Sequence, residues 1–227
     1  MHRFILSDAI KERVNRVQGK AHIVETIDAG RSALVVIDMQ NHYVAQGFPN
    51  EAPVARTIVP NINRMAAAIR SAGGTVIWVK TTSVGALEKW RAHHEFKLAP
   101  EVAARRLESL SEDSPGFELF EGLVPHADDL IVRKIMYSAM IPGSSELHET
   151  LSAAGVEMLL VAGTKTNVCC DTTARDASMR GYRVAMLSDA TATLSDEEHA
   201  AALNNFLVSF GDVLTVDEAI ERLTPAL

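Results

Sequence analysis

Four short runs of apolar residues constrain the fold of this chain more strongly than any other feature. They are Ala33–Ile37, Thr75–Val79, Met158–Ala162 and Tyr182–Leu187. Because these runs are almost continuously apolar, they predict strands that are covered on both faces of a sheet. Two shorter runs, 129–133 and 212–215, predict two further strands.

Amphipathic segments separate these runs and predict helices. They lie near 55–72, 143–154, 168–180, 195–209 and 216–222. Ser195, followed three residues later by Glu198, is typical of a helix start. Strands that alternate with helices predict βαβ units and a mostly parallel sheet, so the expected fold class is α/β.

Length and composition limit the function classes. With 227 residues, of which 47% are apolar and 22% charged, the chain predicts one domain with a full core. A net charge of −7 and the lack of a basic run disfavour binding to nucleic acid or to an anionic membrane surface. The two cysteines are adjacent and predict no disulfide framework, and no signal peptide or membrane span is recognisable, so we expect a cytoplasmic protein.

Two segments stand apart from the strand and helix pattern. Residues 1–30 predict an N-terminal arm that packs on the body or on a neighbouring subunit, and residues 31–227 form the predicted domain. Within it, the irregular, charged stretch 81–128 predicts helices and loops that project from the sheet as a lid. This stretch carries His93 and His94, which we interpret as solvated rather than as a ligand pair.

Candidate catalytic residues follow the predicted strands. Asp38, Lys134 and Cys169 each come at or just after the carboxyl end of a strand, and in an open parallel sheet these ends form the ligand-binding edge. A carboxylate, a lysine and a thiol together are suited to acyl transfer. Because Cys169 lies where a helix begins and a lysine is expected nearby, we expect its pKa to fall.

Structural interpretations compete with each of these assignments. Asp38 is about equally compatible with a helix cap or an Asx turn. Lys80, after the second strand, is more typical of a solvated edge residue. Cys170 predicts a helix-packing residue. A nucleotide-binding module is disfavoured because no Gly-x-Gly-x-x-Gly or Walker motif is present. A phosphatase role for Asp38 is disfavoured because Gln40 stands where a second Asp is needed.

Three motifs, in order along the chain, resemble the isochorismatase-like cysteine hydrolases. They are Asp38-Met-Gln-Asn, Lys134 with Tyr137-Ser-Ala, and Gly163-Thr-Lys-Thr-Asn-Val-Cys-Cys-Asp-Thr-Thr-Ala-Arg-Asp-Ala. The resemblance covers residues 31 to 222 and implies a three-layer αβα, Rossmann-like sandwich with a six-stranded sheet in the order 3-2-1-4-5-6. It also implies a homodimer or homotetramer.

By this resemblance, Asp38 is the general base and acid, Lys134 positions it and stabilises the thiolate, and Cys169 is the nucleophile. The resemblance also implies a cis peptide at Thr164-Lys165. It places an oxyanion hole around Thr164, Lys165, Thr166 and Cys169. Isochorismatases proper lack the cysteine, which favours hydrolysis of an amide here. Lys80-Thr-Thr replaces the metal ligands of nicotinamidases, so no metal and no cofactor are expected.

The residues of these motifs are most similar to those of ureidoacrylate and N-carbamoyl amidohydrolases. The expected activity is cysteine-dependent hydrolysis of a C–N bond in a small amide, carbamoyl or ureido compound, through a thioester. The alternatives are a catalytically silent binding subunit, or a hydrolase of another small amide or ester such as maleamate. Candidate substrate-binding residues, chosen by position, are Gln40, Tyr43, Trp90, Tyr137 and Met140. For the two tyrosines, core packing is as compatible with the sequence as substrate contact.

Overall fold

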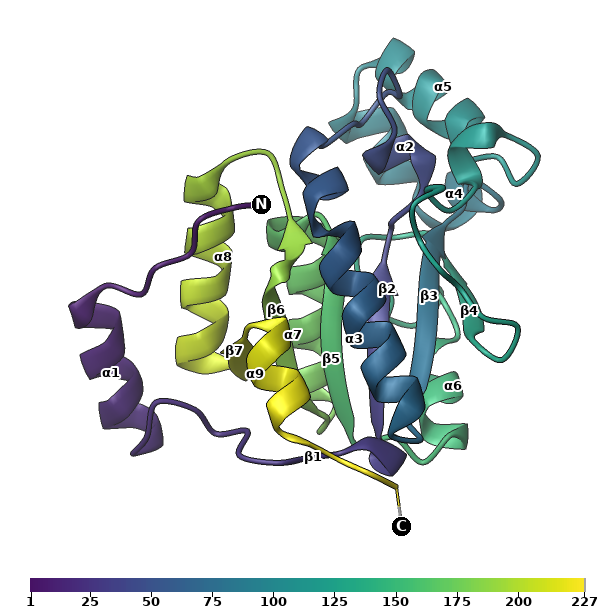
Figure 1. Ribbon diagram of the computed structural model, residues 1–227. Coiled ribbons are helices and arrows are strands. Elements are labelled where there is room, and N and C mark those ends of the chain that lie inside the picture. The colour runs from purple at the N-terminus through teal and green to yellow at the C-terminus, as the bar shows by residue number, and fades with distance from the viewer. Residues whose placement is uncertain (227) are drawn as a thin grey trace.

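The computed structural model describes residues 1–226 and contains a six-stranded parallel sheet (Figure 1). In spatial order its strands are β4 (Leu130–Lys134), β3 (Thr75–Thr81), β2 (Ser32–Ile37), β5 (Met158–Thr164), β6 (Arg183–Ala192) and β7 (Asp212–Leu214). Numbered along the chain, this order is 3-2-1-4-5-6, so the predicted fold class and topology are confirmed. Leu227, the last residue of the predicted domain, lies outside the described residues.

Helices surround this sheet. The α-helices are α1 (Asp8–Gln18), α2 (Asn41–Val44), α3 (Val59–Ser71), α4 (Ala86–Lys89), α5 (Pro100–Ser109), α6 (Leu147–Ala153), α7 (Asp171–Met179), α8 (Asp196–Ser209) and α9 (Val216–Glu221). Short 3-10 helices span Ala29–Arg31, Pro53–Ile58 and Pro115–Phe117, and π-helical turns span His93–Lys97 and Thr166–Cys170.

Each predicted helix is present, with boundaries that local chemistry explains. The segment near 55–72 divides into a 3-10 turn and α3 at Val59, directly before a proline that fits the first turn of a helix. The segment near 168–180 begins as a π-helical turn before α7. Ser195 caps α8 by accepting a hydrogen bond from the Glu198 amide at 3.2 Å, as its position predicts.

Two hydrophobic cores lie on opposite faces of the sheet, because neighbouring residues of a strand point to opposite sides. Leu34 and Val36 of β2 pack with α3 and α9, whereas Ala33 and Val35 pack with α6, α7 and α8. All six residues of β2 are buried, as the continuous apolar run predicts.

β2 and β5 approach each other closely at Gly163, which pairs with Ile37. Its φ of +111° lies in a region that favours glycine. A Cβ atom added at Gly163 would lie 2.0 Å from the carbonyl oxygen of Ile37, so no larger residue fits. This contact sets the spacing of the two strands whose ends carry Asp38 and the Cys169 turn.

A partly buried ion pair ties α3 to the edge of the sheet. The Arg70 guanidinium donates to both carboxylate oxygens of Asp129, at 2.8 and 2.6 Å, and the Trp78 indole donates to the same carboxylate at 2.7 Å. Burial alone raises the pKa of Asp129. The bonds from Arg70, the His126 amide and Trp78 outweigh burial and hold that pKa below its usual value.

The N-terminal residues pack on the body of their own chain. Helix α1 lies beside α8, and β1 (Ile27–Asp28) pairs with β8 (Leu223–Thr224) (Figure 1). His2 accepts a hydrogen bond from the Thr193 amide at 3.0 Å, bonds Asp196 at 2.7 Å and stacks on His199. These contacts hold the first residues against the loop that precedes α8.

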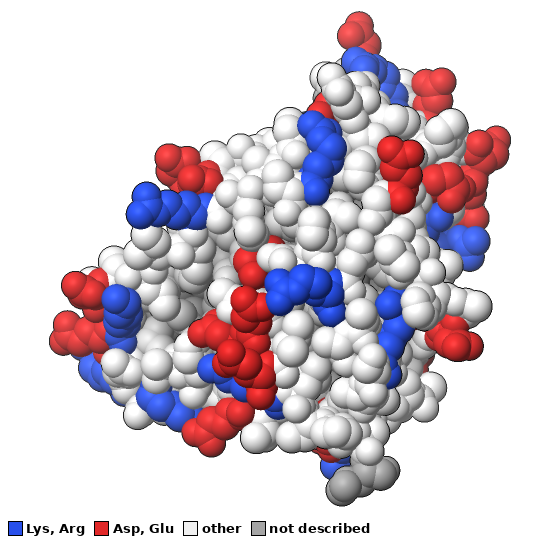
Figure 2. Space-filling model, viewed as in Figure 1, with Lys and Arg blue, Asp and Glu red and all other residues white. Residues whose placement is uncertain are grey.

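Within residues 81–128, α4 and α5 stand above the carboxyl ends of the strands (Figure 1), and residues 122–128 run along α3 to the start of β4. On the face drawn in Figure 2, acidic and basic side chains are interspersed without a continuous basic patch. Among the described residues, no helix is long and apolar enough to cross a membrane.

Candidate active site

Asp38 lies directly after β2, beside the point where the strand order reverses between β2 and β5. It is the one described residue other than glycine with positive φ, at +54°, and Asp tolerates this left-handed conformation better than most residues. Its amide donates to the Val79 carbonyl of β3 at 2.9 Å. The side chain caps no helix; it is fully buried and faces Lys134 and Thr81.

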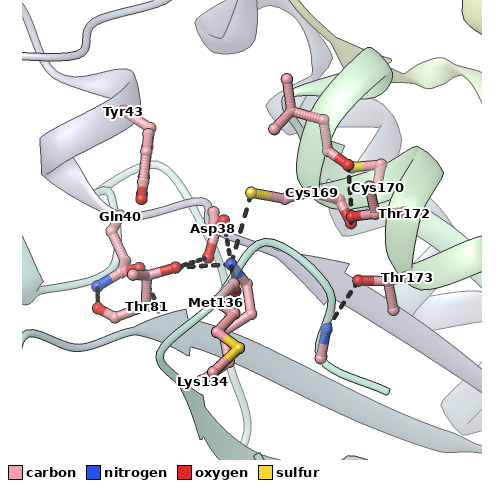
Figure 3. Close-up of polar contacts among 12 residues, drawn as sticks. Asp38, Gln40, Tyr43, Thr81, Lys134, Met136, Cys169, Cys170, Thr172 and Thr173 are labelled. Carbon is pink, nitrogen blue, oxygen red and sulfur yellow. Dashed lines mark hydrogen bonds and ion pairs between the residues drawn. The ribbon is translucent and has the colours of Figure 1, made fainter. Parts of the chain in front are cut away.

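Lys134, the last residue of β4, lies at the centre of this cluster (Figure 3). Its ammonium nitrogen is 2.8 Å from Asp38 Oδ2, and it donates to Thr81 Oγ1 at 2.7 Å and to the Met136 carbonyl at 3.1 Å. Burial by itself lowers the pKa of Lys134, but the Asp38 carboxylate, together with Cys169 and Tyr43, outweighs burial and raises this pKa above its usual value. The lysine is therefore a permanent cation at neutral pH.

Cys169 enters the same cluster from the π-helical turn after β5. Its Sγ lies 3.5 Å from Lys134 Nζ, and the side chain is buried. The expectation that the pKa of Cys169 falls is wrong for the free protein: burial, followed by the Asp38 carboxylate, raises this pKa to about 12, against the opposing effect of Lys134. The sulfur is a thiol at neutral pH, with a carboxylate beside it to take its proton.

The two oxygens of Asp38 have different surroundings. Oδ1 accepts a hydrogen bond from Thr81 Oγ1 at 2.7 Å. Oδ2 faces the Lys134 ammonium but accepts no aligned hydrogen bond from the described residues. One buried carboxylate oxygen thus remains able to accept a proton from Cys169.

The π-helical turn Thr166–Cys170, together with Lys165 directly before it, is called the cysteine turn below. A cis peptide bond between Thr164 and Lys165, at the predicted position, lies between β5 and this turn. The amides of Val168 and Cys170 both donate to the Lys165 carbonyl, at 3.1 and 3.2 Å. Thr166 Oγ1 bonds Nδ1 of His199 at 2.9 Å, so this side chain anchors the turn to α8.

A cavity of about 230 Å³ opens onto Cys169 and is called the Cys169 pocket below. Its lining includes Tyr43 and Tyr137, both predicted to bind substrate. Lys165 and Val168 contribute from the cysteine turn, and Lys165 Nζ donates to Asn50 Oδ1 at 2.7 Å. Cys170 does not line the pocket; it is buried in the core on the α7 side, as predicted for a packing residue.

Three predicted substrate-binding residues lie outside the lining of the pocket. The side-chain amide of Gln40 forms hydrogen bonds with the backbone: it donates to the Thr81 and Phe117 carbonyls, each at 3.0 Å, and accepts from the Thr81 amide. Met140 is 1% exposed and packs in the core. Trp90 stacks on His93, with ring centroids 3.9 Å apart, and supports the pocket wall from behind. For Gln40 and Met140, proximity in sequence to the site motifs did not place the side chain in the pocket lining.

Sequence reasoning missed the residues that give the pocket its polarity. His42, Arg106 and His93 all line it, the last two from the segment 81–128. The interpretation of His93 and His94 as solvated is wrong, since both are buried. Burial and then the charge of Arg106 lower the pKa of His42 to about 3 and that of His93 to about 4, so both are neutral at pH 7. The sequence signal for His93 and Arg106 was their place in an otherwise unexplained insertion, and that for His42 was its place directly after the Asp38-Met-Gln-Asn motif.

Lys80, interpreted as a solvated edge residue, is also buried. Its ammonium lies 3.7 Å from the centroid of the Phe117 ring, a cation–π contact that fastens the 3-10 turn Pro115–Phe117 to β3. Lys80, near the carboxyl end of β3, therefore has a structural role. Residues 1–226 contain no group of three His, Cys, Asp or Glu side chains arranged to hold a metal ion.

The isochorismatase domain model matches residues 32–218 of this sequence. The chain belongs to the isochorismatase family. It is thus an isochorismatase-like hydrolase, and the resemblance of its three motifs is confirmed at the level of the family.

Individual relatives agree with this membership. Ureidoacrylate amidohydrolase RutB of Variovorax paradoxus is 33% identical over 217 residues, which cover 88% of this chain and 84% of the relative. Nicotinamidase 3 of Arabidopsis thaliana is 32% identical over 192 residues, which cover 82% of this chain and 86% of the relative. The crystal structure of a cysteine hydrolase from Pseudomonas syringae pv. phaseolicola superimposes with a TM-score of 0.76 at 32% identity, covering 86% of this chain and 93% of that one.

Proposed function

We propose that this protein is a cysteine-dependent amidohydrolase that cleaves a C–N bond of a small amide, carbamoyl or ureido compound. The observation that carries the proposal is the buried cluster of Asp38, Lys134 and Cys169 beside the Cys169 pocket, with Lys134 Nζ 2.8 Å from the carboxylate and 3.5 Å from the sulfur. Amidohydrolases among the relatives support the reaction class.

In the proposed reaction, Cys169 Sγ attacks the substrate carbonyl carbon while its proton moves to Asp38 Oδ2. The concerted transfer is required because burial and the carboxylate keep the thiol protonated in the free protein. Lys134 stays charged throughout and stabilises the anionic sulfur and carboxylate as they exchange the proton.

The tetrahedral oxyanion is assigned to the backbone amides of the cysteine turn, around Lys165 and Cys169. When it collapses, the C–N bond breaks, and Asp38 returns its proton to the leaving nitrogen as ammonia or an amine departs. The acyl group remains on Cys169 as a thioester. A water molecule, deprotonated by Asp38, then attacks the thioester and releases the acid and the free thiol.

The segment 81–128 is proposed to close over bound substrate, since it supplies His93, Leu98 and Arg106 to the pocket wall. The homodimer or homotetramer implied by the family resemblance stays a prediction, as does the cytoplasmic location.

Ammonia release from a panel of compounds tests the proposal. The panel consists of ureido acids, N-carbamoyl amino acids, biuret, maleamate and nicotinamide. We expect turnover of at least one compound, and we expect Cys169→Ala to abolish it.

Cys170→Ala is the matched control, because it alters the neighbouring thiol without touching the pocket. It should retain turnover. Activity that survives Cys169→Ala but not Cys170→Ala would exclude the assigned nucleophile, and a wild-type protein inactive on the whole panel would favour an ester or another amide as the substrate.

A further inference from the structure

Arg106 of α5 is a buried cation without an ionic partner in the part of the chain that the structure describes. Its side chain lines the Cys169 pocket and is only 8% exposed. Within residues 1–226 its one hydrogen bond runs from Nη1 to the Tyr43 hydroxyl, at 3.2 Å, and its buried Nε has no partner at all. The edge of the guanidinium formed by Nε and Nη2 is therefore not used by the protein.

An unpaired buried charge is costly, because the desolvated ion lacks the compensation that water or a counter-ion provides. The Nε and Nη2 groups of arginine form a planar fork that matches the two oxygens of a carboxylate. A structural role in holding Tyr43 needs only Nη1. The unused edge of Arg106 indicates a ligand that brings its own negative charge.

The other charged residue of the pocket wall is positive as well. Lys165 is a second cation, and its hydrogen-bond partner, Asn50, is neutral. His42 and His93 are uncharged at pH 7, and His42 Nε2 is buried without a partner. Among residues 1–226, no Asp or Glu lines the pocket; Asp38 lies behind Cys169 and is paired with Lys134. The wall thus carries two positive charges in a protein whose net charge is −7.

We propose that the substrate of the Cys169 pocket is an anion: a small amide, carbamoyl or ureido compound that carries a carboxylate, which Arg106 binds through Nε and Nη2 with help from Lys165. This inference rests on the proposed function and narrows it to a substrate class. Arg106 acts as a specificity-determining residue, and neutral amides of the same size are poor substrates.

Substrate pairs that differ only in the carboxylate test the inference. Suitable pairs are 3-ureidopropionate with 3-ureidopropan-1-ol, and succinamate with 4-hydroxybutanamide, in which a hydroxymethyl group replaces the carboxylate. We expect the wild-type kcat/KM to be at least about tenfold higher for the acid, since hydrogen bonds to charged groups typically contribute this much or more. An equal or higher kcat/KM for the alcohol overturns the inference and leaves the proposed function intact.

Variants assign this preference to Arg106. Arg106→Met should lower kcat/KM for the acid by about 10- to 100-fold, mainly through KM, and change kcat/KM for the alcohol by less than about threefold. Arg106→Lys should fall between, because it keeps the charge but loses the fork. Arg105→Met, at the exposed neighbouring position of α5, is the control and should keep the wild-type ratio. An Arg106→Met protein that loses both activities equally would show a structural role only.

Binding tests the site without hydrolysis. Titration calorimetry on Cys169→Ala with 3-ureidopropionate and with 3-ureidopropan-1-ol should give a Kd at least about tenfold lower for the acid. The difference should disappear in Cys169→Ala combined with Arg106→Met. If the wild type hydrolyses nothing but this difference is present, the proposed function fails and the anion site stands. If the two ligands bind equally, the anion site fails whatever the activity.

Discussion

Thr81 joins the two charges of the site, and replacing it with valine isolates what that junction contributes. Its hydroxyl donates to Asp38 Oδ1 and accepts from Lys134 Nζ, each at 2.7 Å, and the side chain is fully buried. Thr81→Val keeps the shape of the side chain and removes both bonds. A hydrogen bond to a charged group contributes about 1.5–3 kcal/mol, so the two together contribute at least about 3 kcal/mol to the free energy of unfolding.

Urea unfolding monitored by circular dichroism measures this loss. For a chain of this size, a loss of about 3 kcal/mol corresponds to a fall in Tm of about 6–12 °C. Thr191→Val is the matched control: Thr191 is equally buried, but its hydroxyl donates to a neutral acceptor, the Leu187 carbonyl, at 3.0 Å. We expect the control to lose only about 1 kcal/mol.

The comparison between these two variants decides the matter. If Thr81→Val loses no more stability than Thr191→Val, the hydroxyl does not bridge the two charges and the electrostatic description of the site is wrong. In the same samples, kcat/KM for the best panel substrate should fall at least about tenfold in Thr81→Val, because the orientation of the carboxylate depends on this bond.

Three further outcomes follow from the geometry. Gly163→Ala should lower the free energy of unfolding by more than about 3 kcal/mol or prevent folding. Gly155→Ala, also at positive φ but in open space, should lower it by only about 1 kcal/mol. Equal effects in urea unfolding would contradict the close approach of β2 and β5. Asp129→Asn should lower the free energy of unfolding by about 3 kcal/mol at pH 7, and in urea unfolding this difference from wild type should shrink below about pH 4. The folded protein holds the Asp129 pKa below its unfolded value, so the stabilisation is lost as the carboxylate is protonated. A difference that does not vary with pH would contradict the assigned pair. Alkylation of Cys169 by iodoacetamide in the Cys170→Ala protein should be slower than that of free cysteine at pH 7 and should rise about tenfold per pH unit up to pH 10, because the pKa of the thiol is about 12; a plateau below pH 8 would show a stabilised thiolate instead.

The framework of the fold could be predicted from the sequence because it depends on strong local patterns. The continuous apolar run at Ala33–Ile37 appears as the fully buried β2, and the capping residue Ser195 starts α8 where its spacing predicts. The π-helical turn at Thr166–Cys170 and the pairing of β1 with β8 were not predicted. The turn depends on the tertiary packing of α7 and α8 against it, and a two-residue strand pair has almost no sequence signal.

The candidate site divides in the same way. The positions of Asp38, Lys134 and Cys169 at strand ends follow from topology, which brings such residues to one edge of the sheet. The pKa of Cys169 was predicted in the wrong direction, because burial depends on the whole tertiary structure and cannot be read from the position of one helix. The sequence did not predict Arg106 as a pocket residue for a related reason. A charged residue on an amphipathic helix is normally assigned to the solvent-exposed face, and only the tertiary structure shows the cavity beside it.

In the proposed reaction, Cys169 forms a covalent acyl intermediate. Acid quenching of the protein during turnover of its best panel substrate, followed by intact-protein mass spectrometry, measures this directly. We expect a mass increase equal to the acyl group in the wild type and in Cys170→Ala, lost on treatment with hydroxylamine, and no increase in Cys169→Ala. An acyl adduct that persists in Cys169→Ala, or undiminished turnover by that variant, would exclude Cys169 as the nucleophile.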